Sequence, residues 1–285
     1  MSAGQRFWVG TWGPATLLFL SSSALAQEDF RNADPDRPIQ VEDAYPLKYR
    51  EWELELGTRP ELRDGAPNLY SWMAELKTGI YYDLQLGVEL ETVLRSGGGL
   101  DSKFGIEELD LHLLYNFNQE TRTLPAVGVR ADLFVPTGGE LGRDEFGYAV
   151  KALATRSFGR LRLHGNLGYR FSNEDGEPAA SDPLEAEDVW LGGLAFDFPI
   201  GLFSRLVLGD VFVELPADRG ETRVTTELGV RFQIRNTWVL DLGLASVVSD
   251  WDDGANGAVI VGLSHTFGVR WLVNVPPYPD PTVDR

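Results

Sequence analysis

Residues 84–94 read LQLGVELETVL, and apolar side chains occupy every second position of this stretch. One face of an extended chain would carry Leu84, Leu86, Val88, Leu90, Thr92 and Leu94, and the other face Gln85, Gly87, Glu89 and Glu91. Successive side chains of a β-strand point to opposite faces. The stretch therefore predicts a strand with one apolar and one charged face.

The same alternation recurs along most of the chain. It predicts about twelve strands, at residues 51–58, 68–78, 84–94, 106–117, 125–135, 147–155, 161–172, 188–198, 204–213, 222–234, 238–246 and 257–267. Most have nearly the length of about ten residues that a tilted strand needs to cross the hydrocarbon layer. The ninth is the weakest, because Asp210 interrupts its apolar face and its register could slip by one residue.

The connections between these stretches distinguish a membrane barrel from a soluble sandwich. They alternate between short ones of about three to seven residues and longer ones of about eight to fifteen. Nothing enforces such alternation in a sandwich, because both of its ends meet the same solvent. The pattern predicts an all-β, closed antiparallel transmembrane β-barrel of about 12 strands, with short periplasmic turns and longer extracellular loops.

Aromatic residues support this orientation. With the start of the chain in the periplasm, one set falls near the outer interface: Tyr70, Trp72, Tyr148, Tyr169, Phe171 and Trp190. A second set falls near the periplasmic interface: Trp52, Tyr115, Phe117, Phe196, Phe198, Phe232, Trp238 and Phe267. Two aromatic belts around an aliphatic band are typical of a protein that crosses two membrane–water interfaces.

The first residues predict export. Residues 1–26 contain a basic Arg6, a short apolar stretch and the small-x-small pattern Ala24-Leu25-Ala26, as a cleaved signal peptide does. The sequence after residue 26 contains no run of about 20 apolar residues, so it predicts no transmembrane helix. The chain has no cysteine, and its net charge of −18 argues against nucleic-acid binding. We therefore expect the mature chain in the outer membrane of a Gram-negative bacterium.

Two segments lie outside the predicted barrel at residues 51–267. Residues 27–50 are polar and punctuated by proline, and they could either fill the barrel as a plug or extend into the periplasm. Residues 268–285 form a proline-rich tail that cannot extend a strand ladder. Phe267, just before it, would serve as the aromatic signal for the barrel-assembly machinery.

The predicted inner face is charged rather than apolar. The candidate lumen-lining residues are Glu75, Lys77, Glu89, Glu91, Asp110, His112, Arg130, Asp132, Lys151, Arg162, His164, Arg170, Glu227 and Arg231. Paired charges of both signs could form a structural network that fills the lumen, or they could line a path for a polar solute. Twelve strands enclose more space than the eight that side chains alone can fill, so a conduit is physically reasonable.

The same face assignment predicts where a new charge is tolerated. Arginine at Leu111 or Leu228 would meet lipid and destabilise the barrel, whereas arginine at Asn166 or Gly229 would lie on the opposite face and be far better tolerated for assembly.

Catalytic and metal-binding patterns are missing from the sequence. His112 and His164 should face the lumen, and His265 should face lipid, with its neighbour Ser264 on the opposite side. No G-x-S-x-G occurs, and the histidines are too scattered to form a metal motif. The stretch 250–254 (DWDDG) lacks the later glutamate of a calcium loop. We expect neither an enzyme nor a cofactor or metal.

Several phrases resemble the outer-membrane protein family named for the meta-cleavage pathway of phenol degradation. They are RPI at 37–39, EDA at 42–44, ELELG at 53–57, LPAVGVR at 124–130, VPTGG at 135–139 and LHGNLGYRF at 163–171. The resemblance implies an outer-membrane barrel that transports small aromatic or other hydrophobic compounds, and it offers no catalytic residues. The implied partners are outer-membrane lipid, lipopolysaccharide, the barrel-assembly machinery and that solute.

The function predicted from these observations is a porin-like passive channel for small hydrophobic or aromatic compounds. Two alternatives stay open. One is a structural or surface-interaction barrel with a closed lumen, and the other is an outer-membrane lipid hydrolase.

Overall fold

A computed structural model describes residues 30–63, 67–97, 100–172, 188–201, 204–217, 222–249 and 257–268. Within these ranges the chain forms twelve strands: β1 Glu51–Leu62, β2 Asn68–Tyr81, β3 Leu84–Gly97, β4 Leu100–Asn118, β5 Ala126–Val135, β6 Gly147–Phe158, β7 Leu161–Phe171, β8 Val189–Pro199, β9 Arg205–Pro216, β10 Arg223–Arg235, β11 Trp238–Val247 and β12 Gly257–Gly268. The predicted number of strands and their approximate positions are confirmed. This part of the chain contains no helix long and apolar enough to cross a membrane.

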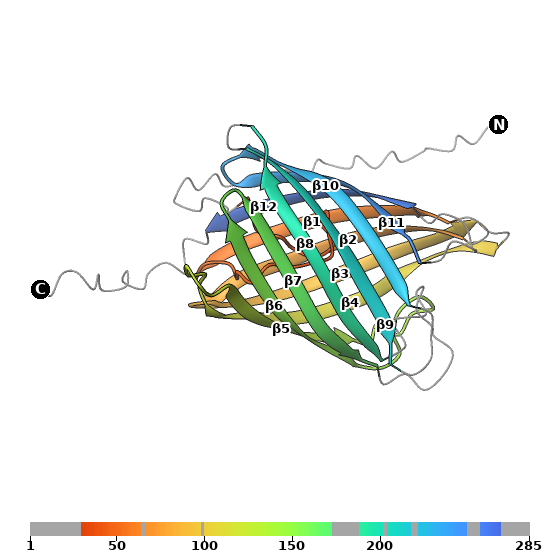
Figure 1. Ribbon diagram of the computed structural model, residues 1–285. Helices are drawn as coiled ribbons and strands as arrows, with labels where there is room; N and C mark the ends of the chain where they lie inside the picture. The colour runs from red at the N-terminus through yellow and green to blue at the C-terminus, as the bar shows by residue number, and fades with distance from the viewer. Residues whose placement is uncertain are drawn as a thin grey trace, which may run out of the picture.

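The strands close into one antiparallel barrel. Each strand pairs with its neighbours in sequence, and β1 pairs with β12 to complete the ring. Strongly tilted strands wrap the barrel, and the segment before β1 curls into its interior (Figure 1). Closure leaves no unpaired sheet edge, which is a condition for a sheet to span a lipid bilayer. The predicted fold class is therefore confirmed.

The predicted alternation of connection lengths is only partly right. The ladder between β3 and β4 continues beyond the membrane-sized part of both strands, as far as the pair Gly97 and Leu100. The long connection predicted after residue 94 is therefore mostly an extended hairpin. Residues 100–105 (LDSKFG) lack the apolar alternation of a membrane strand, so sequence periodicity alone assigned them to a loop.

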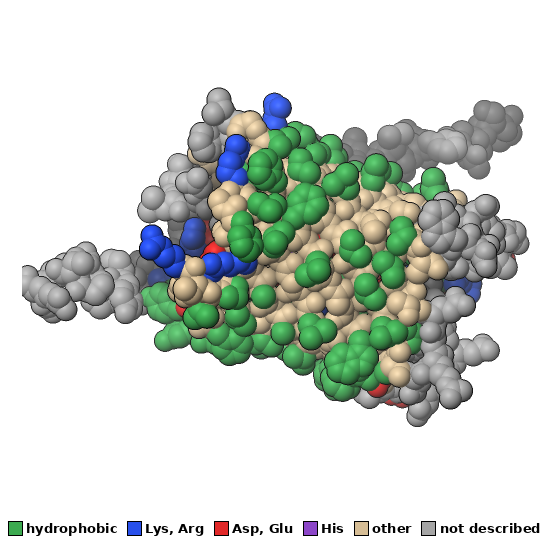
Figure 2. Space-filling model, viewed as in Figure 1, with side chains coloured by type: hydrophobic (Ala, Val, Ile, Leu, Met, Phe, Trp, Pro, Cys, Tyr) green, Lys and Arg blue, Asp and Glu red, His purple; other side chains and the backbone are tan. Residues whose placement is uncertain are grey.

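The two faces of the strands are assigned correctly by the alternation. Leu194, Leu228 and Leu244 point outward and are 74%, 58% and 64% exposed. Inward positions such as Glu55, His112 and Arg231 are almost fully buried. Hydrophobic side chains are spread over the outer surface of the strands, while Lys and Arg side chains gather at one end (Figure 2). This distribution is what a surface in contact with lipid requires.

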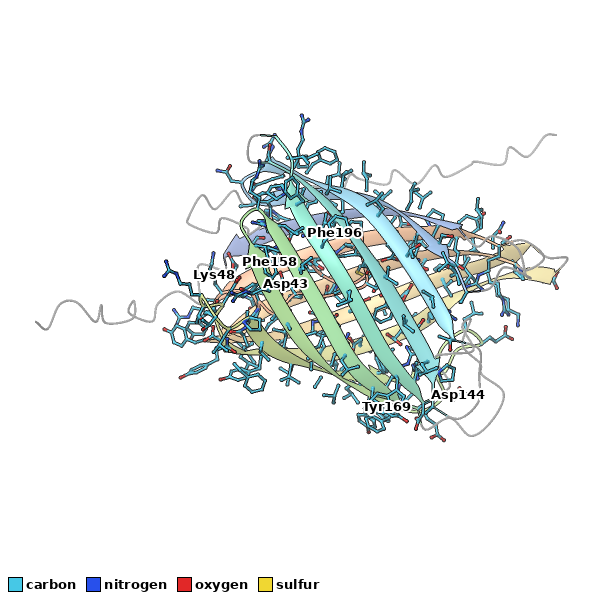
Figure 3. The ribbon with its side chains drawn as sticks, in the orientation of Figure 1. Asp43, Lys48, Asp144, Phe158, Tyr169 and Phe196 are labelled. Carbon is cyan, nitrogen blue, oxygen red and sulfur yellow. The ribbon has the colours of Figure 1, made fainter. Side chains whose placement is uncertain are left out.

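Aromatic clusters occur at both ends of the barrel. Lys48 and Phe158 lie at the end with the short turns, and Tyr169 and Asp144 lie at the opposite end (Figure 3). Tyr169 packs against Trp190 with ring centroids 4.7 Å apart. At the short-turn end, the rings of Tyr115 and Phe117 are 5.1 Å apart. Both predicted belts therefore contain packed aromatic groups.

The ninth strand keeps its register, and its apparent irregularity has a structural cause. Leu206 and Leu208 point inward on β9, together with Asp210, and all three are buried. The leucines pack against apolar residues of the N-terminal segment. Asp210 accepts hydrogen bonds from that segment. The inner face of β9 thus mixes apolar and acidic side chains because it contacts another part of the chain instead of water.

A lipid-facing charge is expected to be costly. Leu111→Arg and Leu228→Arg should each lower the free energy of unfolding by about 2–4 kcal/mol, because both side chains lie on the outward face of mid-strand positions. Chemical unfolding of the protein in lipid vesicles measures the effect. Leu111→Ala and Leu228→Ala are matched controls that remove the side chain without adding charge. If the arginine and alanine variants unfold alike, the surface is not in contact with hydrocarbon.

Some predictions fall outside the described residues. These are the signal peptide at 1–26, the acidic stretch at 250–254 and almost all of the proline-rich tail at 268–285, of which only Gly268 is described.

Candidate functional site

Most of the N-terminal segment, residues 30–50, lies inside the barrel, and Lys48 and Tyr49 near its end are exposed. Ile39 and Val41 are fully buried against Leu206 and Leu208 of β9. Ala44 is fully buried in a second apolar cluster whose other buried members are Leu114, Ala126 and Leu153. Of the two positions left open by the sequence, inside the barrel or in the periplasm, the structure adopts the first.

Barrel side chains satisfy the backbone of this segment. The Gln40 and Val41 N–H groups donate to Asp210 Oδ2 at 2.8 and 3.0 Å. The Glu42 N–H donates to Asn166 Oδ1 at 2.8 Å, and the Ala44 N–H donates to Thr155 Oγ1 at 3.1 Å. Asn166 also donates to the Glu42 carbonyl at 2.8 Å. Because an irregular buried segment has no ladder of its own, these polar side chains replace it.

Ion pairs hold the same segment to β1 and β2. Arg37, which is fully buried, forms an ion pair with Glu55. Lys77 Nζ lies 2.6 Å from Glu55 Oε1 and 2.7 Å from Asp34 Oδ1. Charged side chains of the segment and of the barrel strands thus alternate in sign at this point. Each buried charge therefore has a partner of opposite sign.

On the opposite wall, Asp197 of β8 joins three groups. Its carboxylate lies 2.6 Å from the Arg31 guanidinium, 2.6 Å from Arg162 Nε and 3.0 Å from His164 Nε2. Asp197 is fully buried, so a carboxylate at this position depends on those partners. Arg31 belongs to the segment, and Asp197 thus links the segment to β7 and β8.

Three further pairs lie along the inner face. Arg231 binds Asp241 at 2.7 Å and also donates to the Arg37 carbonyl at 3.0 Å. The other two pairs are Glu227 with Arg59 at 2.9 Å and Arg170 with Glu214 at 3.4 Å. These predicted residues face inward as expected, and they are paired across neighbouring or nearby strands.

A denser cluster occupies β4 and β5. Arg130 lies 2.5 Å from Asp132, 3.3 Å from Asp110 and 3.2 Å from Glu42 of the segment. Lys151 of β6 is 3.7 Å from Asp132.

Four more predicted residues extend this cluster across β2, β3 and β4. His112 Nε2 lies 3.1 Å from Glu75 Oε1. Glu89 lies opposite Asp110 in the strand register, and Glu91 lies opposite Glu108. Glu89 and Glu91 are half-buried. All fourteen predicted lumen residues thus lie on the inner face of the barrel.

Several charged residues of this interior were missed from the sequence. Asp197, Asp241 and Arg59 occupy inward positions, and the strand alternation could have identified them. Asp34 and Arg37 could not be found in this way, because residues 30–50 follow no strand period.

Burial changes the electrostatics of the segment. Burial raises the pKa of Asp43 to about 7, although the nearby Arg162 guanidinium and two backbone N–H groups act in the opposite direction. Those N–H groups belong to Ala33 and Tyr45, and they donate to the two Asp43 oxygens at 3.1 and 2.8 Å. Asp43 therefore folds the segment back on itself inside the barrel.

Three further features of the described residues lie around the filled interior. At the short-turn end, a cavity of about 810 Å³ is lined by aromatic and charged side chains, including Tyr45, Tyr49, Tyr82 and Arg162. At the other end, Leu141 and Arg143 of the β5–β6 connection are buried, and Leu141 packs on Leu69 and Val93. A third, largely apolar groove of about 820 Å³ lies along β10, β11, β12 and β1, between residues such as Leu228, Leu244 and Val259.

One arrangement has the residue types of a hydrolase. Thr155 Oγ1 lies 3.0 Å from His164 Nδ1, and His164 Nε2 lies 3.0 Å from Asp197 Oδ2. The threonine is fully buried, and its hydroxyl accepts the Ala44 N–H. A nucleophile must reach its substrate, whereas this hydroxyl is enclosed beneath the segment. Thr155, His164 and Asp197 therefore form a structural link between the segment and the barrel strands.

The better tolerance predicted for arginine at Asn166 and Gly229 stays a prediction, and the contacts at both positions count against it. Asn166 makes two hydrogen bonds with the Glu42 backbone. A Cβ atom at Gly229 would lie 2.4 Å from Pro38 Cγ, and one at its register partner Gly243 would lie 2.7 Å from Pro38 Cβ. The face assignment is correct, but the segment occupies the space that the sequence left open.

The closed barrel, its apolar outer surface and its filled polar interior define the fold of bacterial outer-membrane β-barrel proteins. Solved structures share it, and three of them are compared with this chain by their identity, coverage and TM-score. The NanC porin is 8% identical, covers 74% of this chain and 98% of its own, and has a TM-score of 0.56. An outer membrane channel from Pseudomonas putida F1 is 12% identical, covers 82% and 100%, and has a TM-score of 0.57. The KdgM porin is 9% identical, covers 75% and 99%, and has a TM-score of 0.50.

At these identities the likeness concerns the fold. No family model and no curated protein matches the chain. The resemblance to the family of the phenol meta-cleavage pathway therefore stays a prediction.

Proposed function

We propose that this protein is a passive channel of the bacterial outer membrane for a small hydrophobic or aromatic compound, and that residues 30–50 close it in the observed conformation. The observation that carries the proposal is the way in which the segment is held. Most of its anchoring contacts are hydrogen bonds and ion pairs with inward side chains. Water can replace such contacts at low net cost in free energy. A segment held by polar contacts can therefore leave the lumen while the ring of strands stays intact.

The cavity at the short-turn end supports a solute with aromatic character. Tyr45, Tyr49 and Tyr82 line it, and Tyr49 packs against Tyr82 with ring centroids 5.2 Å apart. Its volume of about 810 Å³ falls within the usual range for a small-molecule site. The apolar groove on the outer surface offers an apolar compound a second place to collect. Neither feature is needed by a barrel that only fills the membrane.

The main alternative is a scaffold with a permanently closed lumen. The paired buried charges of the interior favour it, because an ion-paired network can fill a lumen as a rigid structural core. The two functions differ in what happens when the segment is removed.

Deletion of residues 27–50, with the signal peptide kept, tests the proposal in planar lipid bilayers. The full-length protein should conduct little, and the deletion variant should form a steady open channel, because the ring of strands is complete without the segment. Vesicle uptake of a small aromatic compound should then rise as well. Heat-modifiable gel migration checks that both proteins are folded. A folded deletion variant that neither conducts nor takes up solute would favour the scaffold.

A further inference from the structure

Asp110 and His112 of β4 and Asp132 of β5 meet at one point on the inner wall. Each of the three offers one ligand atom, and these atoms all lie within 4.8 Å of one another. Asp110 and His112 share a face of β4, and Asp132 lies directly opposite His112 in the ladder. All three side chains are buried.

The polar atoms at this point are incompletely used. Among the described residues, no hydrogen-bond partner occurs for Asp110 Oδ1 or Asp132 Oδ2. The His112 ring nitrogens Nε2 and Nδ1 lie 3.1 Å from Glu75 Oε1 and 3.4 Å from Asp110 Oδ2. Arg130 contacts the other carboxylate oxygens, Asp132 Oδ1 at 2.5 Å and Asp110 Oδ2 at 3.3 Å. The guanidinium therefore holds both carboxylates from one side and leaves one oxygen of each without a hydrogen bond. Lys151 Nζ, at 3.7 Å from Asp132 Oδ2, is beyond hydrogen-bond distance.

We propose that Asp110, His112 and Asp132 bind one divalent transition-metal ion, for which Zn²⁺ is the reference. One imidazole and two carboxylates are a ligand set suited to such ions. Ligands at about 2.0–2.2 Å from a common ion lie roughly 3–4 Å apart. Modest rotations of the three side chains therefore bring them within bonding distance.

The surroundings provide what a metal site needs beyond its ligands. Glu75 Oε1 lies 3.1 Å from His112 Nε2, where it can orient the ring and leave Nδ1 for the metal. Charge also favours a cation. Among the described residues, the four carboxylates of Glu42, Glu75, Asp110 and Asp132 meet the side-chain cations Arg130, Lys151 and Lys77. Lys77 is shared with Asp34, Glu53 and Glu55, so negative charge is in excess here. A bound cation would offset this excess.

The backbone opposite His112 is matched to the ring. Gly87 of β3 is its register partner, and a Cβ atom there would lie 2.1 Å from His112 Nε2. The imidazole thus occupies the volume that any other residue at position 87 would fill. Sequence spacing did not predict this site, because its ligands come from two strands and the ring depends on a third.

Zinc titration by calorimetry tests the proposal on full-length, tag-free protein folded in detergent and stripped of metal. We expect one saturable site per chain. Asp110→Asn, His112→Gln and Asp132→Asn should each abolish it, and Glu75→Gln should weaken zinc affinity about ten- to 100-fold. His265→Gln is the matched control, because His265 stacks on Trp238 outside the cluster and should bind zinc as wild type does.

X-ray absorption of the zinc-loaded wild-type protein gives a readout that needs no variant. The proposal requires one imidazole nitrogen and oxygen ligands at about 2.0–2.2 Å. Heat-modifiable migration shows whether each variant is folded. The proposal is overturned by the lack of a saturable site, by zinc without a nitrogen ligand, or by a folded His112→Gln variant with wild-type affinity. In each of these cases His112 is a structural residue that contacts Glu75 and Asp110.

Discussion

Asp197→Asn is expected to lower the free energy of unfolding by about 3–5 kcal/mol, the usual cost of removing one partner from a buried ion pair. The substitution changes almost no volume, so packing on β8 is kept. It removes the charge that faces Arg31, Arg162 and His164. The Asp43 carboxylate, another anionic contact of Arg162, is more distant, at 3.9 Å. Chemical unfolding in lipid vesicles measures the loss.

The matched control for this variant is Asp83→Asn. Asp83 is exposed in the turn between β2 and β3, and its side chain accepts one hydrogen bond at 3.3 Å, from Gln119. Its replacement should change stability by no more than about 0.5 kcal/mol. Limited proteolysis adds a second readout, since the loss of the Arg31 contact should expose the start of the segment. Equal stabilities for the two variants would mean that the Asp197 charge is solvated by water in the lumen.

The outer face of this protein could be predicted from the sequence almost completely. Lipid contact imposes a single rule, apolar side chains at every second position, and residues 84–94 and 222–234 follow it without interruption. The facing of His112 and the inward position of Arg162 follow from the same rule.

The inner face could be predicted only in part, because two chain segments share it. Inward positions follow from strand alternation, but their partners do not. Arg37 contacts Glu55, and Glu42 contacts Arg130, across long sequence separations that no period encodes. Leu206 and Leu208 look like an irregular strand until Ile39 and Val41 are placed against them. The local sequence pattern predicts which side chains of a strand face lipid. The position of residues 30–50 depends instead on complementarity between side chains that are distant in sequence.

Gly243→Val is expected to open the barrel without shortening the chain. Gly243 points inward on β11, and a Cβ atom there would lie 2.7 Å from Pro38 Cβ; the next nearest atom, 3.3 Å away, is the Pro38 carbonyl oxygen. Valine favours strands, so the wall should accept the new side chain while Pro38 must move. Arg37, the neighbour of Pro38, would then lose its position beside Glu55. We expect bilayer conductance to rise toward that of the variant that lacks residues 27–50.

Two controls separate displacement of the segment from damage to the wall. Gly192→Val introduces the same side chain on β8 at a position with no atom within 4 Å of the new Cβ, and it should leave conductance at the wild-type level. Gly243→Val in the variant without residues 27–50 should fold and conduct like that parent, because Pro38 is gone. A folded, silent Gly243→Val protein whose segment still resists protease would show that Pro38 can shift without releasing the rest. The plug would then be held by its ion pairs with Glu55, Arg130 and Asp197, with the fit of Pro38 contributing little.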